Sequence, residues 1–367
     1  MLAPLISAGA AIAAPRHSGV TTSERFADLR MEWNELLSAS RSDCIFLTWE
    51  WLNTWWSHLS ESRKLALVAL REGDELQALA PLTFKWPKAE FCGSGFVGSD
   101  YLDFIVREGW EEEARTAFTS RLSKAPAMKL TNLRRGENFV TEVASSLQAK
   151  GWRVSETKTN VCPYIPLSGH SWDSYLATLG SEHRYNLNRR LRQLNREFDV
   201  RFEAARTPDQ ARQFTDILLA QHNQRWKERG GSDAFHTAGL ISFHREFTQI
   251  ALRRGWLRLF VLLLNGRPAA SLYGFLYNGV FYFYQSGFDP AFQKYSVGLV
   301  VMGLAIKSAI EEGAGEYDFL HGDEEYKSRW TPERRELGRL ELYPPGPYGF
   351  AYGTVMDFGR RLKRIVR

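Results

Sequence analysis

The chain has 367 residues and a net charge of +5; 44 % of its residues are hydrophobic and 24 % are charged. These proportions are typical of a globular protein and exclude an intrinsically disordered or fibrous chain. The length is sufficient for two domains with cores of ordinary size. No apolar run reaches the roughly 18 residues that a membrane-spanning helix needs.

The first 20 residues are expected to form a flexible tail. They contain a short apolar, alanine-rich stretch, but no basic residue precedes it, as one would in a secretory signal. An export signal is the alternative interpretation of this tail.

Three cysteines, Cys44, Cys92 and Cys162, are widely separated in the sequence. They show neither CxxC nor Cys/His metal spacing, so no metal cofactor is predicted. Buried thiols in a reducing, cytoplasmic setting are the expectation.

Residues 21–168 are predicted to form a first domain. Thr48 is expected to cap a helix with the aromatic run Trp49 to Trp56, which either packs on a sheet or walls a ligand groove. Asp100 and Asp103, in a strand predicted over 99–106, either contact a substrate or cap turns. Further elements give an alternating α/β pattern: helices near 24–37, 110–124 and 137–150, a hairpin around Gly73-Asp74, and strands at 128–133 and 152–155.

Residues 169–197 are predicted to connect two halves through a basic helix. Ser181 is expected to cap this helix, in which Leu187, Leu191 and Leu194 form a narrow apolar stripe. Arginines surround the stripe, so the helix is either a solvated linker or a surface that contacts phosphate. Aromatic residues are nearly absent among the arginines, so sequence-specific nucleic-acid binding is only weakly indicated.

Residues 198–345 are predicted to form a second domain. A strand over 198–204 precedes a helix with Pro208 at its first position, and a second helix follows near 240–254. Asn265-Gly266 and Asn278-Gly279 separate runs of hydrophobic residues and predict three hairpin-linked strands. Such hairpins differ from the crossover helices of a Rossmann fold.

Residues 279–330 are predicted to contain the active site. A strand, Val280–Gln285, leads through a loop to a helix that begins near Ser296, where backbone N–H groups can hold phosphate. A second strand, Tyr317–Leu320, delivers a polar loop. His321 lies between carboxylates and should titrate near neutrality, which favours it as a general base. The other candidate bases are Asp318, Asp323 and Glu324, and a structural histidine bonded to the backbone is the alternative.

The chain resembles the GNAT acyltransferase superfamily, and in particular its CelD/FemAB-like branch, in which two such domains share one chain. The resemblance covers roughly residues 40–345 and is carried by four segments: Phe46-Leu47-Thr48 to Trp55, Ser181 to Arg190, Phe283 to Asp289, and Tyr317 to Trp330. It implies an α/β fold of the α+β type. Two tandem GNAT-like domains are expected, each with a mixed, mostly antiparallel central sheet flanked by helices.

The resemblance also implies acetyl-CoA or another acyl-CoA as donor substrate. In the superfamily the CoA pyrophosphate sits on a helix N-terminus at a Gln/Arg-x-x-Gly-x-Gly/Ala loop. The matching stretch lacks the first of these glycines. The predicted cofactor contacts are Gln285, Ser286, Gln293, Lys294, Tyr295, Ser296 and Gly298.

Acyl transfer needs a base for the acceptor and a proton donor for the departing thiolate. By resemblance, Tyr326 is the proton donor. Lys327 matches a lysine of FemAB-like peptidyltransferases, in a Gly-x-x-x-Tyr/Phe-Lys arrangement, that is implicated in stabilising the transition state. A lysine paired with a surface carboxylate, Glu324 or Asp323, is the alternative. His321 and Asp318 are the favoured bases. The predicted substrate contacts are His222, Arg225, Tyr284 and Asp323.

The function predicted from this resemblance is an acyl-CoA-dependent N- or O-acyltransferase, an acetyltransferase in the first instance. Its acceptor would be a sugar, an amine or a lipid-linked precursor of the cell envelope or of a polysaccharide. The alternatives are an aminoacyl-tRNA-dependent transferase and a non-catalytic acyl-CoA-binding protein in exopolysaccharide synthesis. No DNA partner is expected. Residues 346–367 are predicted to form a basic helix, either solvated or in contact with the inner face of the membrane.

Overall fold

The computed structural model describes residues 18–21, 26–227 and 235–355, and the side chains of all of these except 18–21 and 223–227. The first 17 residues of the predicted tail therefore lie outside the described part, as do residues 356–367 of the predicted C-terminal helix. Residues 18–21 form a strand and residues 347–355 are helical. No helix among the described residues is long and apolar enough to cross a membrane.

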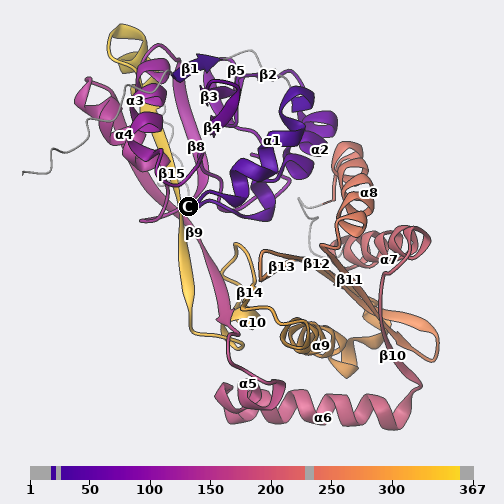
Figure 1. Cartoon of the computed structure of the whole chain (residues 1–367). Coiled ribbons are helices and arrows are strands. Elements are labelled where there is room, and N and C mark those ends of the chain that lie inside the picture. The colour runs from indigo at the N-terminus through magenta and orange to yellow at the C-terminus, as the bar shows by residue number, and fades with distance from the viewer. Residues whose placement is uncertain (1–17, 22–25, 228–234, 356–367) are drawn as a thin grey trace, which may run out of the picture.

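The first half contains both helices and strands, and a series of strands occupies residues 64–106 between two of its helices (Figure 1). Its elements are β1 (Ser18–Thr21), α1 (Phe26–Ser38), η1 (Ile45–Leu47), α2 (Trp49–Leu59), β2 (Lys64–Leu65), β3 (Val68–Glu72), β4 (Glu75–Ala80), β5 (Leu82–Lys85), β6 (Lys88–Phe91), β7 (Ile105–Val106), α3 (Glu111–Leu122), β8 (Ala127–Arg134), α4 (Val140–Ala149) and β9 (Arg153–Pro166).

The second half begins with two helices and ends on a long strand. Its elements are α5 (Trp172–Thr178), α6 (Ser181–Glu197), β10 (Val200–Ala204), α7 (Pro208–Lys227), α8 (Ala238–Arg253), β11 (Leu257–Leu264), β12 (Arg267–Tyr277), β13 (Val280–Phe288), η2 (Pro290–Tyr295), α9 (Val297–Glu311), β14 (Glu316–Asp318), α10 (Glu325–Ser328) and β15 (Arg334–Tyr343).

One sheet of 11 strands runs through both halves in the order β10-β11-β12-β13-β14-β9-β15-β8-β6-β5-β2. A second sheet, β1-β3-β4-β7, belongs to the first half. The strand β15 lies between β9 and β8, antiparallel to both, although it comes last in the chain. In Figure 1 the long β9 and β15 visibly join the upper and lower parts of the molecule. The two halves are therefore joined by strands that belong to one continuous sheet.

Both faces of the sheet in the second half are covered. In β11, Leu259 and Val261 belong to a core that also takes in α7, α8 and the first half, whereas Phe260 and Leu262 belong to a core with α9, α5 and α6. This alternation is the period-2 pattern of a strand buried on both sides.

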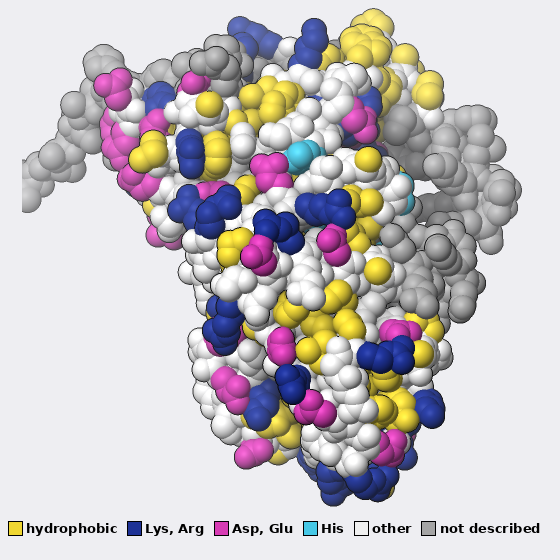
Figure 2. Space-filling model, turned by 90° about the vertical axis from the view of Figure 1, so that its right-hand side faces the viewer, with side chains coloured by type: hydrophobic (Ala, Val, Ile, Leu, Met, Phe, Trp, Pro, Cys, Tyr) yellow, Lys and Arg dark blue, Asp and Glu magenta, His cyan; other side chains and the backbone are white. Residues whose placement is uncertain are grey.

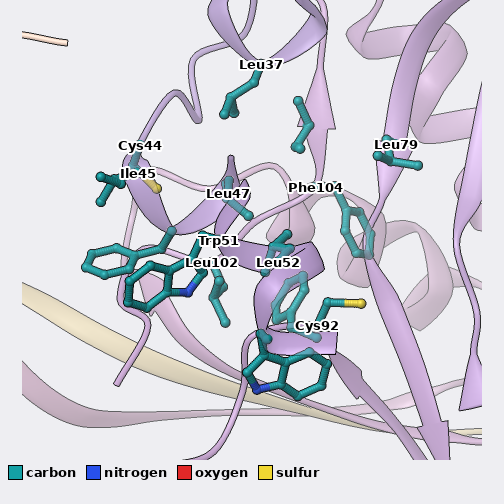
Figure 3. Close-up of a cluster of buried hydrophobic side chains, with 14 of the residues drawn as sticks. Leu37, Cys44, Ile45, Leu47, Trp51, Leu52, Leu79, Cys92, Leu102 and Phe104 are labelled. Carbon is teal, nitrogen blue, oxygen red and sulfur yellow. The ribbon is translucent and has the colours of Figure 1, made fainter. Parts of the chain in front are cut away.

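The core of the first half is continuous with that of the second, and Trp51 is one of the side chains that join them. Figure 3 shows Trp51 among Leu47, Leu52 and Leu102, in a cluster of buried side chains. Its ring also meets Phe243 and Phe247 of α8 edge-on, with ring centroids 4.9 and 4.7 Å away. The aromatic run of α2 therefore forms core packing that joins the halves, and Thr48 caps the helix by accepting from the backbone N–H of Trp51.

Local signals placed most other elements correctly. Both Asn-Gly turns join antiparallel strands, and Asn278 and Gly279 have φ of 46° and 73°, the left-handed values that a type I′ turn requires. Pro208 is the first residue of α7.

Several predicted element boundaries were wrong. The strand predicted over Tyr317–Leu320 is β14, Glu316–Asp318, because the chain after Asp318 leaves β13. The strand expected over 99–106 is reduced to β7, because the Asp103 carboxylate accepts from the N–H groups of Phe139 and Val140 at the start of α4 and holds the preceding residues as a loop. The N-cap of α6 is Gly180, and Ser181 is the first helical residue. The strand predicted at 152–155 continues to Pro166, because it pairs along its length with β15.

Candidate active site

The candidate site lies where two parallel strands separate. β13 pairs with β14 only at Val280↔Glu316, Phe281↔Tyr317 and Tyr282↔Asp318. Beyond Tyr282, β13 continues to Phe288 along β12, whereas the chain after Asp318 turns toward β9, where the N–H of Phe319 donates to Pro163 O. The two chains therefore diverge and leave a wedge between them.

A cleft of about 430 Å³ occupies this wedge. One wall comes from β13, with Phe283, Tyr284 and Gln285, and the other comes from the segment after β14. The first half closes the cleft with a glycine-rich loop and with residues of β8 and β9. The residues contributed by the other elements are Phe319, Leu320, His321, Glu324, Tyr326 and Lys327 from the second half, and Gly95, Phe96, Gly98, Asn132, Thr159 and Asn160 from the first.

His321 is held by a carboxylate from the other half of the molecule. Its Nδ1 lies 2.9 Å from Asp100 Oδ1, and its backbone N–H donates to Asp100 Oδ2 at 2.8 Å. Asp100 is completely buried, while the His321 side chain is 42 % exposed and lines the cleft. Since the carboxylate can only accept, Nδ1 carries the proton and Nε2 is the basic nitrogen. The negative charge of Asp100 raises the pKa of His321 above its ordinary 6.5, against the opposing effect of burial.

Gly98 leaves room for this ring. It has a φ of +67°, and a Cβ added there would lie 3.6 Å from His321 Cε1 and 3.7 Å from the Tyr284 hydroxyl. A side chain at position 98 would therefore narrow the cleft beside the imidazole and require a left-handed backbone that favours glycine.

Lys327 is buried beneath the loop that carries His321. Its Nζ donates to His321 O at 2.9 Å and lies 2.9 Å from a Glu324 carboxylate oxygen. Only 3 % of the residue is exposed. Gly322, with a φ of +135°, allows the close approach, because a Cβ there would lie 2.7 Å from Lys327 Nζ. The ammonium group therefore fixes the loop between Leu320 and Glu324 and, through it, the imidazole.

Two tyrosines also line the cleft. Tyr326 follows Glu325 at the start of α10 and is 37 % exposed. The hydroxyl of Tyr284 donates to Val97 O in the glycine-rich loop and lies 3.4 Å from His244 Nε2, and burial raises its pKa. Tyr284 thus ties β13 to the first half, while Tyr326 lies at the solvent side.

Asp318 lines a different cavity, on the other side of the loop that carries Asp100 and Tyr101. This second cavity has a volume of about 570 Å³. There Asp318 accepts from the Tyr101 hydroxyl at 2.6 Å and lies 3.2 Å from Arg335 Nη1. Burial raises its pKa to about 6. Of the four residues predicted to be catalytic, the structure thus brings three together, His321, Tyr326 and Lys327.

The predicted cofactor residues fall into two places. Gln285 lines the cleft and Ser286 follows it on β13, whereas Gln293, Lys294, Tyr295, Ser296 and Gly298 lie in η2 and the first turn of α9 and do not line it. The ring of Tyr295 meets Phe198 edge-on at 5.0 Å, so this segment packs near the end of α6. Ser296 has a φ of 54° and a ψ of 42°, a left-handed conformation.

The predicted substrate contacts are also dispersed. Tyr284 lines the cleft, but His222 is buried, with its ring edge-on to Phe235 at 4.9 Å. Asp323 is exposed and lies 3.7 Å from Arg334 Nη1. The side chain of Arg225 lies outside the described residues.

Sequence reasoning missed the partner of His321. Asp100 was noted as either a substrate contact or a turn cap, but it lies 221 residues from His321 in the chain, and no local pattern links the two. Within the described ranges, no group of three His, Cys, Asp or Glu residues could hold a metal ion.

Residues 181–328 match a family model described as the acetyltransferase (GNAT) domain. No curated protein matches the chain. The match to the family model spans α6 of the second half, the separated strands and the loop with His321, Tyr326 and Lys327.

Solved structures share the fold of nearly the whole chain. The crystal structure of FemX superposes with a TM-score of 0.61 at 14 % identity, covering 85 % of this chain and 95 % of FemX. The C-terminal domain of a putative lysylphosphatidylglycerol synthetase from Agrobacterium fabrum gives 0.53 at 11 % identity, covering 90 % and 96 %. A tandem GNAT protein from the clavulanic acid biosynthesis pathway gives 0.50 at 10 % identity, covering 90 % and 100 %.

These likenesses confirm the predicted fold class, a tandem arrangement of mixed, mostly antiparallel sheets flanked by helices. At such identities they establish the fold alone, and the family model adds a match to the GNAT domain over residues 181–328. The chain therefore contains a segment that matches the acetyltransferase (GNAT) family, and nearly its whole length has a fold similar to those of FemX and of the tandem GNAT protein.

Proposed function

We propose that this protein is an acyltransferase that takes an acyl group from acyl-CoA, in the first instance acetyl-CoA, and transfers it in the cleft between β13 and the segment after β14. The observation that carries the proposal is the separation of these strands around a cleft lined by His321, Tyr326 and Lys327. The GNAT family match over the same residues supports it.

The donor fits the cleft through the exposed edge of β13. Residues 283–288 pair with β12 on one side, and among the described strands none pairs with their other edge. Backbone N–H and C=O groups on such an edge can bind an extended chain with amide groups as an added strand would. The pantetheine arm of CoA is such a chain, and it would lead the pyrophosphate toward the first turn of α9, where Ser296 and Gly298 lie.

The chemistry follows from the side chains around the cleft. His321 Nε2 is the base for the acceptor, because Asp100 occupies Nδ1. The Tyr326 hydroxyl protonates the sulfur of the departing CoA thiolate. Lys327 is already bonded to His321 O and Glu324, so we assign it to holding the catalytic loop.

The experiment that tests this proposal is acetyl-CoA binding by isothermal titration calorimetry, followed by measurement of CoA release. Binding and turnover in the wild type are expected. Tyr326→Phe should bind acetyl-CoA normally and lose turnover by about 10²-fold or more, because it removes a general acid. Tyr185→Phe, at an exposed position on α6, is the matched control. Wild-type protein that does not bind any acyl-CoA contradicts the proposal, and binding without turnover indicates the acyl-CoA-binding alternative.

A second candidate, transfer from aminoacyl-tRNA, is favoured by α6. This helix carries five arginines, Arg184, Arg189, Arg190, Arg192 and Arg196, and Figure 2 shows a cluster of basic side chains at the lower end of the molecule, where α6 lies. A phosphate-binding surface there predicts tRNA affinity that falls steeply with salt. Filter binding of tRNA at several salt concentrations separates the two donors, since the acyl-CoA proposal expects no such slope.

A further inference from the structure

The cleft contains little to hold a positively charged acceptor. Of the described residues that line it, Glu324 alone carries a carboxylate, and that carboxylate lies 2.9 Å from the buried ammonium of Lys327. An ammonium ion leaving water for such a cleft would find no counter-charge, which is unfavourable. The carboxylate-rich surface at this junction is the second cavity, on the far side of the loop with Asp100.

Neutral hydrogen-bonding groups and aromatic rings line the cleft instead. Asn132, Thr159, Asn160 and Gln285 supply amides and a hydroxyl. One group of each amide bonds the backbone: Asn132 Nδ2 donates to Ser99 O, and the amide oxygens of Asn160 and Gln285 accept from the N–H groups of Val161 and Ser286. The opposite group of each amide is therefore the one that a ligand can bond. Phe96, which is 64 % exposed, presents a ring at the glycine-rich loop. Amide and hydroxyl groups both donate and accept, as alcohols do. This combination of neutral polar groups and exposed rings suits an uncharged, polyhydroxylated molecule such as a sugar.

The base has the arrangement that a hydroxyl nucleophile needs. A free amine forms when an ammonium, with a pKa near 10, releases its proton to solvent before attack. Water and alcohols have a pKa of roughly 16 and lose the proton only as they attack, so the base must touch the nucleophile. A carboxylate behind an imidazole fixes the tautomer and stabilises the imidazolium that forms. Asp100 does both for His321, and it bonds the His321 backbone as well.

We infer that the acceptor nucleophile is a hydroxyl group of an uncharged, sugar-like molecule, activated by His321 with Asp100 from the first half as the positioning residue. The inference rests on the proposed function. In the step, the acceptor oxygen attacks the thioester carbonyl carbon and its proton passes to His321 Nε2. The C–S bond then breaks, and Tyr326 protonates the sulfur. The products are an ester and CoA; the tyrosinate and the imidazolium then exchange protons with solvent.

The test measures CoA release from acetyl-CoA by the full chain with water alone, with methyl glucoside and with spermidine. Wild type should hydrolyse acetyl-CoA slowly, and methyl glucoside should accelerate release more than spermidine does. His321→Gln should lower hydrolysis by about 10²- to 10⁴-fold. His58→Gln is the matched control, because His58 also pairs with a carboxylate, Glu246 at 2.6 Å, but lies outside the cleft.

The positioning role of Asp100 has its own readout. Asp100→Asn should lower hydrolysis and move its pH midpoint downward, since the charge that raises the His321 pKa is removed. The same downward move should appear when His321 is titrated by NMR in the two proteins. A purely structural role for Asp100 would reduce the rate without moving either midpoint.

Three results would overturn the inference: hydrolysis unchanged in His321→Gln, acceleration by spermidine alone, or acetyl-CoA binding without any hydrolysis. The first two results leave acyl-CoA as the donor, whereas the third leaves acyl-CoA binding alone and indicates the non-catalytic alternative. If acetyl-CoA does not bind, the proposed function fails first. The inference is then tested with p-nitrophenyl acetate, an acyl donor that needs no CoA site. His321→Gln should lower the rate of its hydrolysis and His58→Gln should not.

Discussion

At the scale of single residues, the chemistry of the cleft depends on a contact between two distant positions. His321 stands in the polar loop that the sequence singled out, and its raised pKa follows from a charge 221 residues away. The sequence indicated which histidine to examine. Its partner, however, is determined by the position that the glycine-rich loop of the first half takes against the second half. That contact is tertiary and has no local signature.

The pair predicts a pH-dependent contribution to stability. The folded protein raises the pKa of His321 above 6.5. The pair therefore stabilises the fold fully at pH values below the pKa that His321 has in the unfolded chain. This stabilisation is lost as pH rises through the pKa that His321 has in the folded protein. Asp100→Asn should therefore destabilise the protein more at pH 5.5 than at pH 8.5. Urea unfolding at the two pH values measures the difference, and an equal or larger loss at pH 8.5 would contradict it.

Ser296 gives a second prediction at this scale. In the stretch Gln293 to Gly298 it stands where the superfamily motif has its first glycine, and it adopts the left-handed conformation, although its side chain makes no capping hydrogen bond. Replacing it with glycine removes a backbone cost of roughly 1–2 kcal/mol and adds a smaller entropic cost, so Ser296→Gly should stabilise the fold by about 0.5–1 kcal/mol. Ser296→Ala is the control and should not stabilise. Chemical denaturation of the three proteins gives the comparison.

At the scale of elements, periodicity and turn chemistry predicted most helices and strands, because their causes are local. The Asn-Gly turns and Pro208 at the start of α7 are examples. The errors came where a distant group decided the outcome: Asp103 bonds the start of α4, which confines the strand predicted over 99–106 to its last two residues, and β15 extends β9.

The packing of α6 on α9 gives a prediction about an element. Leu187 is fully buried, and a Cβ added at Gly303 of α9 would lie 2.9 Å from its Cδ1, so the two helices approach closely there. Leu187→Ala should cost about 2–5 kcal/mol of unfolding free energy. Tyr185→Ala, at a position that is 60 % exposed on the same helix, should stay within about 0.5 kcal/mol. Similar losses in both variants would show that α6 is not docked through Leu187.

At the scale of the whole molecule, the division into domains at residues 168 and 198 stays a prediction. In the structure, strand pairing and core packing cross between the two halves. One continuous core includes Trp51 of α2 and Phe243 and Phe247 of α8, and β14 pairs with β9. The sequence indicated two units of one fold class, but the shared sheet follows from nonlocal pairing that periodicity cannot reveal.

The shared core predicts that the two halves unfold together. Urea unfolding followed by far-UV circular dichroism and by tryptophan fluorescence should give coincident single transitions. A fragment of residues 169–345 should be unfolded or insoluble, since it exposes the edge of β14 and the face that packs on Trp51. Two separated transitions, or a soluble folded fragment, would show that the halves are independent domains.

The position of β15 has a consequence for synthesis on the ribosome. Residues 334–343 fill the place between β8 and β9, so until they emerge both of those strands have an unpaired edge and the first half cannot complete its sheet. Multidomain chains usually fold unit by unit as they are made, but here the nascent first half must wait for a segment that follows the second half's other strands. The cleft, with Asp100 on one wall and His321 on the other, therefore forms in a complete sheet only after residues 334–343 have been translated, and shorter nascent chains have exposed strand edges that invite aggregation.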